Sequence, residues 1–203
     1  MTWYVVRAGG MVALVLLTVS VVLGITLSGR ARVPRWPRFA LEDVHAFAGT
    51  LAGVFIGLHG AALLVDHYLP FSLADVLVPG IAPYRSLATA LGVVGAELLF
   101  ALALTNRYRK RLPYSLWRRL HYLNFAVWTL ALVHGIAAGT DSDTAWGAVV
   151  YAVCGGSVVG AVAWRALRTR VTPWAARLSF ATGSVVGAEL VLALTLGPLA
   201  HHA

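Results

Sequence analysis

The chain has 203 residues, of which 59% are hydrophobic and only 12% are charged, and its formal net charge is +8. Such a composition excludes an ordinary soluble domain, which could not bury that many apolar side chains. The positive charge is concentrated between apolar stretches, which favours a membrane topology over a nucleic-acid-binding surface.

Six windows of about 20 residues are nearly free of charge, and each is long enough to cross a bilayer as a helix. The first is too long for a signal-peptide core and lacks a small-residue cleavage site, so we interpret it as a retained helix. The sequence therefore predicts an all-α integral membrane protein, a single domain over residues 1–203 folded as a bundle of six transmembrane helices. The windows are 8–28, 44–65, 86–106, 120–140, 144–164 and 178–200.

The longest connector, residues 66–85, contains Pro70, Pro79 and Pro83 among several apolar residues. Proline density prevents a long regular helix there. Two interpretations remain open. One is a short interfacial helix over residues 72–77 at the outer mouth of the bundle, and the other is an apolar loop that dips into the headgroups.

The basic residues are distributed unevenly between the two sides of the predicted bundle. Cytoplasmic loops carry the excess of Lys and Arg in membrane proteins. The sequence therefore predicts a protein of the cytoplasmic membrane with both termini exterior, leaving only Arg7 and Arg85 outside. The basic residues assigned to the cytoplasm are Arg30, Arg32, Arg35, Arg38, Arg107, Arg109, Lys110, Arg111, Arg118, Arg119, Arg165, Arg168, Arg170 and Arg177.

Two acidic residues, Glu97 and Glu189, fall near the middle of predicted spans, where an ionisable group is costly. A protonated carboxyl bonded to a neighbouring helix is the favoured interpretation, and a role in proton transfer is the alternative.

Four histidines occupy matching positions in two of the spans. His45 and His59 are 14 residues apart, and His121 and His134 are 13 apart. At 1.5 Å per residue, each pair of positions is separated by about 20 Å along a helix. Two such helices side by side would offer one His–His pair near each membrane face, and two imidazoles are the axial ligands that a low-spin haem iron needs. The lone Cys154 cannot supply a C-x-x-C-H attachment, so any haem is held non-covalently by histidine.

The helical phase differs between the two segments. At about 100° per residue, His59 returns to within about 40° of His45, and the small residues Ala48, Gly49 and Ala52 lie between them on that face. Small residues leave room for a flat macrocycle, and they equally permit close helix packing. His134, in contrast, falls about 140° from His121. Three features could compensate for this difference in helical phase: local overwinding, a kink near Gly135, or haems that enter from different gaps between helices.

Topology predicts how the histidines pair. The second and fourth spans run in the same direction, so His45 pairs with His121 near the cytoplasm and His59 with His134 near the exterior. Haem propionates bind cations, and Arg118 and Arg119 precede His121, while Arg85 begins the third span on the exterior side. Trp128, between the two histidines, is either a large core side chain or a group packed between two macrocycles.

These residues resemble the ferric reductase-like transmembrane domain family, which includes ferric reductases, NADPH oxidases and the haem subunit of periplasmic methionine sulfoxide reductase. The resemblance rests on the two histidine spacings, on the Arg-Arg-Leu-His-Tyr sequence at 118–122, on His134-Gly135, and on Gly-Thr-Asp at 139–141. It implies two b-type haems per chain and electron transfer from a cytoplasmic donor to an exterior acceptor. The fused flavin–nicotinamide module of many members is not expected here.

The leading functional hypothesis is therefore a di-haem b-type cytochrome, reduced by a separate flavin reductase or by a quinol. One alternative is the haem subunit of a methionine sulfoxide reductase-type complex. Another is a haem-free structural or transport subunit whose histidines bond between helices. The sequence leaves the terminal acceptor open.

Overall fold

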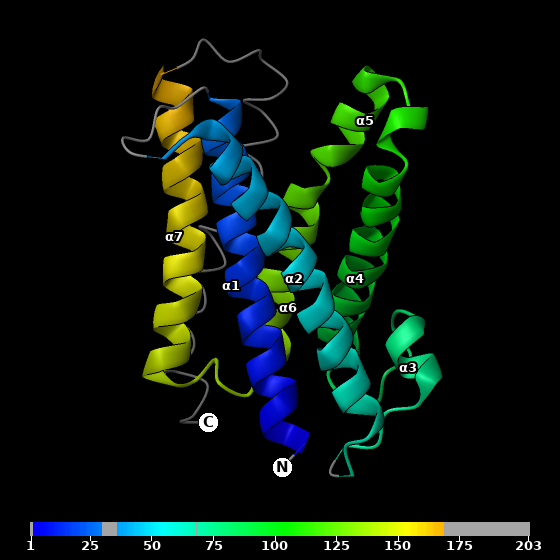
Figure 1. Ribbon diagram of the computed structural model, residues 1–203. Coiled ribbons are helices and arrows are strands. Elements are labelled where there is room, and N and C mark those ends of the chain that lie inside the picture. The colour runs from blue at the N-terminus through cyan, green and yellow to red at the C-terminus, as the bar shows by residue number, and fades with distance from the viewer. Residues whose placement is uncertain (1, 30–35, 68, 169–203) are drawn as a thin grey trace. The chain divides into compact units, whose positions relative to one another are not determined.

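The computed structural model describes residues 2–29, 36–67 and 69–168, and within these residues it contains helices and no strand. Figure 1 shows their arrangement. The α-helices are α1 (Thr2–Ser28), α2 (Arg38–Leu64), α3 (Leu73–Leu77), α4 (Ser86–Arg107), α5 (Tyr114–His121), α6 (Asn124–Ala138) and α7 (Ala145–Arg168), and the 3-10 helix η1 (Arg109–Arg111) lies between α4 and α5.

Five segments of the described chain are long and apolar enough to cross a membrane. They are α1, α2, α4, α7 and the combined segment Tyr114–Ala138, which contains α5 and α6. Large apolar side chains point outward along them: Leu87 is 84% exposed and Phe100 67% exposed. Outward apolar side chains suit lipid rather than water. An all-α integral membrane protein is therefore confirmed, and the sixth predicted span, 178–200, lies outside the described residues.

The described residues form two compact units. Of the residues described, the first contains those in 2–14 and 52–139, and the second contains those in 15–51 and 140–168. In the first unit, α4 packs along α6, and α5 packs against α4. In the second unit, the Arg165 guanidinium on α7 donates a 2.7 Å hydrogen bond to the Ser28 hydroxyl at the end of α1.

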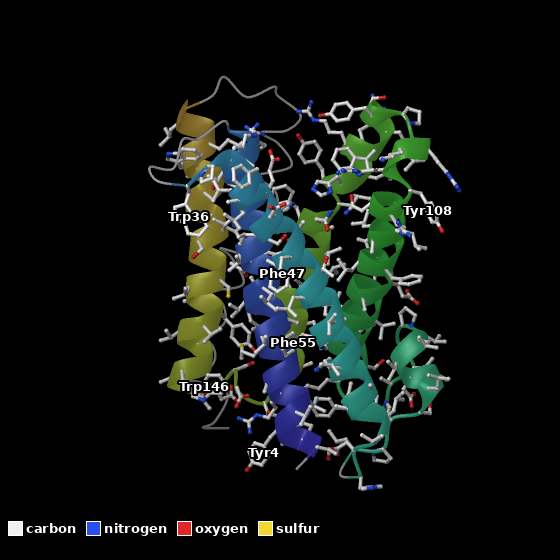
Figure 2. The ribbon with its side chains drawn as sticks, in the orientation of Figure 1. Tyr4, Trp36, Phe47, Phe55, Tyr108 and Trp146 are labelled. Carbon is white, nitrogen blue, oxygen red and sulfur yellow. The ribbon has the colours of Figure 1, made fainter. Side chains whose placement is uncertain are left out.

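Exposed aromatic side chains lie near the ends of the long helices (Figure 2). Tyr4, in the first turn of α1, is 71% exposed, and Tyr108, at the end of α4, is 50% exposed. Trp36 and Trp146 lie near the starts of α2 and α7 and are also exposed. Amphipathic rings at helix ends are typical of residues that anchor a span at the membrane–water interface.

A short helix occupies the proline-rich connector, as the first of the two interpretations of that segment predicts. Its place at the membrane interface over the outer mouth of the bundle stays a prediction. Ser72 caps α3: its hydroxyl accepts from the Asp75 backbone N–H, while the Asp75 carboxylate accepts from the Ser72 backbone N–H at 2.8 Å. This is a capping box, which satisfies two otherwise unpaired groups. Hydrogen bonds from the Ser72 hydroxyl and backbone N–H hold the pKa of the Asp75 carboxyl below its usual range.

Candidate functional site

The first unit brings His59 of α2 and His134 of α6 together. Their ring centroids are 6.2 Å apart and their planes lie at 80° to each other. These two residues are 75 positions apart in the sequence, so tertiary packing alone creates the pair. Of the four predicted ligands, these are the two that one unit places ring to ring.

Each imidazole of this pair is anchored by a backbone carbonyl of another helix. His59 Nδ1 lies 2.8 Å from the carbonyl oxygen of Val6 on α1, and His134 Nδ1 lies 2.8 Å from that of Ala88 on α4. A carbonyl oxygen only accepts, so Nδ1 carries the proton in both rings and the lone pair is on Nε2. This tautomer is the one in which Nε2 can bind a metal.

The geometry fits a shared haem iron better than a metal held by protein side chains alone. Among the described residues, no group of three or more His, Cys, Asp or Glu side chains could hold a metal ion. Two imidazoles are the protein ligands that a low-spin haem iron takes. One ion bound by both rings through bonds of about 2.0 Å would, with half of each ring, hold the two centroids roughly 6 Å apart. The observed separation of 6.2 Å is close to that value.

His45, in the second unit, is anchored in the same way. Its Nδ1 lies 2.8 Å from the carbonyl oxygen of Ser20 on α1. The Ser20 hydroxyl is 3.2 Å from the same nitrogen and donates to the His45 carbonyl oxygen at 3.3 Å. Ser20 therefore contacts His45 through both its backbone and its side chain.

His121, the last residue of α5, is held by an aromatic neighbour. Its ring stacks on Trp117, one turn earlier, with centroids 5.1 Å apart and planes at 26°. The Trp117 indole N–H donates to the Asn106 side-chain oxygen at 2.9 Å, which ties α5 to the end of α4. His45 and His121 belong to different units, so their pairing stays a prediction.

The turn between α5, which ends at His121, and α6, which carries His134, is overwound. The backbone N–H groups of Tyr122, Leu123 and Phe125 donate to the carbonyls three residues earlier, and that of Tyr122 also donates to the Arg118 carbonyl, four residues earlier. Such 3-10 bonds give about 120° of rotation per residue instead of about 100°. Added rotation is in the direction that would bring His134 toward the phase of His121. Local overwinding, one of the three alternatives for the 13-residue spacing, thus occurs at this turn, and α6 runs through Gly135 to Ala138. Which alternative aligns the two imidazoles stays a prediction.

The small residues between His45 and His59 are enclosed by protein. Ala48 is 3% exposed and Ala52 is completely buried, while a Cβ at Gly49 would meet the Ser20 hydroxyl at 3.4 Å. The burial of Ala48 and Ala52 is what close packing, the alternative interpretation, predicts for those two positions, whereas Gly49 is half-buried. Trp128 is also completely buried, as expected of a core side chain. Contact of Gly49, Ala52 or Trp128 with a macrocycle stays a prediction.

Arg85 lies beside the His134 end of α6. Its guanidinium donates to the Ala137 carbonyl oxygen at 2.7 Å, which satisfies an unpaired carbonyl in the last turn of that helix. Arg85 itself has φ of 40°, a left-handed conformation that is strained for a residue with a Cβ. Four of the five guanidinium N–H groups are not needed for the Ala137 bond, so a propionate could share this cation.

The two arginines before His121 differ in their contacts. The Arg118 guanidinium reaches the Tyr122 hydroxyl at 3.3 and 3.4 Å, which keeps it on the same helix surface one turn later. Arg119 is exposed. Their contact with haem propionates stays a prediction.

Glu97 is exposed on α4, and within the described residues it forms no hydrogen bond or ion pair. The predicted bond to a neighbouring helix is therefore not formed in that part of the chain. Glu189 lies outside the described residues, so its predicted bond is not addressed.

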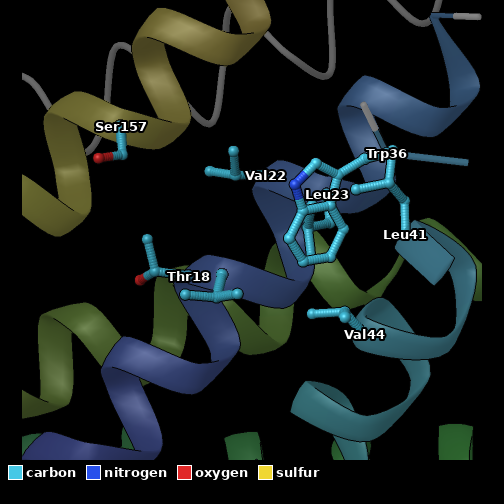
Figure 3. A pocket seen from close by; sticks show the side chains of 8 residues that line it. Thr18, Val22, Leu23, Trp36, Leu41, Val44 and Ser157 are labelled. Carbon is cyan, nitrogen blue, oxygen red and sulfur yellow. The ribbon is translucent and has the colours of Figure 1, made fainter. Parts of the chain in front are cut away.

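The second unit contains a cavity of about 420 Å³ between α1, α2 and α7 (Figure 3). Its lining is almost entirely apolar, apart from the hydroxyls of Thr18 and Ser157 and the indole of Trp36. None of the eight lining side chains is a histidine, cysteine or carboxylate, so the cavity supplies no metal ligand.

Sequence reasoning missed the groups that hold the imidazoles. These are backbone carbonyls of α1 and α4, the Ser20 hydroxyl and the Trp117 ring. A backbone carbonyl cannot be recognised from the sequence, because every residue has one. Trp117 could have been recognised, since it precedes His121 by four residues, which places both rings on one helix face.

The ferric reductase like transmembrane component family model matches residues 9–133 of the chain. That match covers more than half of the sequence, so the chain belongs to this family. The matched region includes His45, His59 and His121 and stops one residue before His134. No curated protein and no solved structure is similar enough to be matched to the chain.

Proposed function

We propose that this protein is a di-haem b-type cytochrome that carries electrons outward across the cytoplasmic membrane. The observation that carries the proposal is the His59–His134 pair, with centroids 6.2 Å apart and both Nδ1 atoms directed at carbonyl oxygens. Membership of the ferric reductase-like family supports a membrane electron-transfer role. By analogy of spacing, His45 and His121 hold the second haem.

The chain's residues bind and insulate the group that carries the electron. A haem supplies an iron that accepts and releases one electron at a time. His59 and His134 present Nε2 as ligands, because their Nδ1 protons are engaged by Val6 and Ala88. Fully buried Trp128, Val127 and Leu132, which are on the same helix as His134, exclude water from the interior of the bundle. In such a low-dielectric interior, a site with a low net charge is favoured over one with a high net charge.

The direction of transfer follows from topology. The basic connectors support a topology with His45 and His121 near the cytoplasm and His59 and His134 near the exterior. A separate flavin reductase or a membrane quinol is the proposed donor, and the acceptor is exterior. We assign no nucleic acid as a partner.

A pyridine haemochrome assay on purified protein tests this proposal. We expect about two haems per chain and a low-spin spectrum typical of two axial imidazoles. His67→Ala is the matched control, because His67 is an exposed histidine beyond the end of α2 and should leave haem content unchanged. Haem content near zero after expression with ample haem would refute the proposal.

A further inference from the structure

Three of the four predicted ligands share one local arrangement. The acceptors of the imidazole N–H are the carbonyls of Val6 for His59, Ser20 for His45 and Ala88 for His134. The residue four positions after each acceptor is a glycine. These glycines are Gly10, Gly24 and Gly92.

Each of these glycines lies directly against the imidazole in question. A Cβ built on Gly10 would approach His59 Cε1 and Nδ1 to 3.2 Å, and one on Gly24 would approach His45 Cε1 to 3.3 Å. A Cβ on Gly92 would come within 2.7 Å of both Cε1 and Nδ1 of His134. We call each carbonyl with its glycine a carbonyl–glycine notch.

Helix geometry explains why the glycine follows its acceptor by four residues. In an α-helix, every Cα–Cβ bond leans toward the N-terminus, so a side chain covers the turn before its own position. A Cβ at position i+4 therefore stands beside the carbonyl oxygen of residue i. That oxygen already accepts the N–H of residue i+4, and its second lone pair is open to an outside donor only where no Cβ intervenes.

We propose that Gly10, Gly24 and Gly92 are positioning residues for the haem ligands. Each leaves open the second lone pair of a helix carbonyl, so that the imidazole can donate Nδ1–H to it and present Nε2 to iron in a fixed ring plane. This inference rests on the proposed haem ligation and goes beyond it, because it assigns ligand orientation to glycines on α1 and α4. These helices carry no predicted ligand.

Replacement of each glycine by alanine tests the proposal. Alanine has the higher helix propensity, so a simple helix effect would stabilise the protein. In a notch, the added methyl group should instead displace the imidazole and rotate its plane. Loss of such a supporting contact typically weakens metal binding by about 10- to 100-fold. The effect should decrease from Gly92→Ala to Gly10→Ala to Gly24→Ala, because the Cβ approaches are 2.7, 3.2 and 3.3 Å.

The readouts are haem per chain and the largest g value in the electron paramagnetic resonance spectrum of the ferric protein. That g value depends on the angle between the two imidazole planes, because the angle sets the splitting of the iron d orbitals. We expect Gly92→Ala and Gly10→Ala to alter the same haem signal, since they hold His134 and His59. Gly24→Ala should alter the other signal.

Two glycines outside the notches provide controls. Gly95 is one turn after Gly92 on α4, and its Cβ would meet only Leu130 Cβ at 3.4 Å and the Val127 carbonyl oxygen at 3.9 Å. A Cβ at Gly57 on α2 would have no neighbour within 4 Å. Gly95→Ala and Gly57→Ala should keep both haem signals.

The outcomes separate the notches from the function. Two haems with an unchanged spectrum in Gly92→Ala would overturn the notch proposal alone, as would equal changes in Gly95→Ala. If Gly92→Ala does not accumulate, an unchanged spectrum in Gly10→Ala would overturn it, because a displacement of a few tenths of an ångström is sufficient there. Absence of haem from the unmodified protein would overturn both proposals.

Discussion

His134 and His121 lie on one predicted membrane span, yet the protein holds their imidazoles in different ways. His134 donates its Nδ1–H to Ala88, which is 46 positions away on another helix. His121 stacks on Trp117, which is four positions away on the same helix. The first contact depends on how α4 and α6 pack, and the second requires only that α5 is helical.

The imidazoles at the two ends of the span should therefore respond to substitutions in different helices. The His134 imidazole depends on tertiary packing, so substitutions on α4 should affect it. The His121 imidazole has a local aromatic support, so substitutions on α5 itself should affect it. The following predictions test that separation, from the largest expected effect to the smallest.

Removal of single ligands should have the largest effect. We expect His134→Ala and His59→Ala each to deplete the exterior-side haem, and His121→Ala and His45→Ala each to deplete the cytoplasmic-side haem. The measurement is haem content with resolved redox titration. Ligands of one haem act together, so the double variant His59→Ala with His134→Ala should resemble its single variants. Loss of the same haem from His45→Ala and His134→Ala would show that the pairing is wrong.

Loss of the stacked indole should have an intermediate effect, confined to the cytoplasmic-side haem. Trp117→Ala removes an aromatic contact worth about 0.5–1.5 kcal/mol, which corresponds to roughly 2- to 10-fold weaker haem retention. Trp117→Phe keeps a ring for stacking and loses the bond to Asn106, so it should retain most of the haem. Retention can be measured by transfer of haem to an apo-globin acceptor. An effect on the His134 haem equal to that on the His121 haem would break the proposed separation.

Substitution of Arg85 should have the smallest effect on haem retention, and its effect should appear in the stability of the protein. Arg85→Ala removes the donor to Ala137 but keeps a Cβ in the left-handed conformation. Arg85→Gly removes the same donor and relieves the strain, which costs about 1–2 kcal/mol for a residue with a Cβ. Thermal unfolding should therefore find Arg85→Gly more stable than Arg85→Ala. Equal stability of the two variants would show that the strain at position 85 contributes nothing.

Hydropathy predicts the membrane part of each helix but not its true ends. The predicted window 86–106 differs by one residue from α4, whereas α2 begins at Arg38, six residues before the window 44–65. Helical hydrogen bonding is cooperative, so a helix continues into polar flanks once it has formed. Arg38 and Glu42 support that extension with a 2.8 Å ion pair at i and i+4.

The spacing of the histidines identifies the predicted ligands, but the sequence cannot show which groups orient their imidazoles. His59 and His134 come together as topology predicts, and their role as haem ligands stays a prediction. The acceptors at Val6 and Ala88 are backbone atoms, so any residue type could supply them. The overwound turn cannot be predicted from the sequence either, because Tyr122 and Leu123 are neither glycine nor proline and carry no local signal for a break. Tertiary packing decides both features.

The overwound turn also changes the length of the segment along the helix axis. A 3-10 residue rises about 2.0 Å instead of 1.5 Å, so the three short bonds donated by Tyr122, Leu123 and Phe125 lengthen the segment as well as rotating it. Thirteen residues with such a turn therefore advance roughly 21 Å, which is also the advance of 14 residues of regular α-helix. On this count the His121–His134 segment gains nearly the same rise as the His45–His59 segment with one residue fewer, and part of the same rotation. A chain that gained one residue after Leu123 and lost the tight turn should place its two imidazoles equally well.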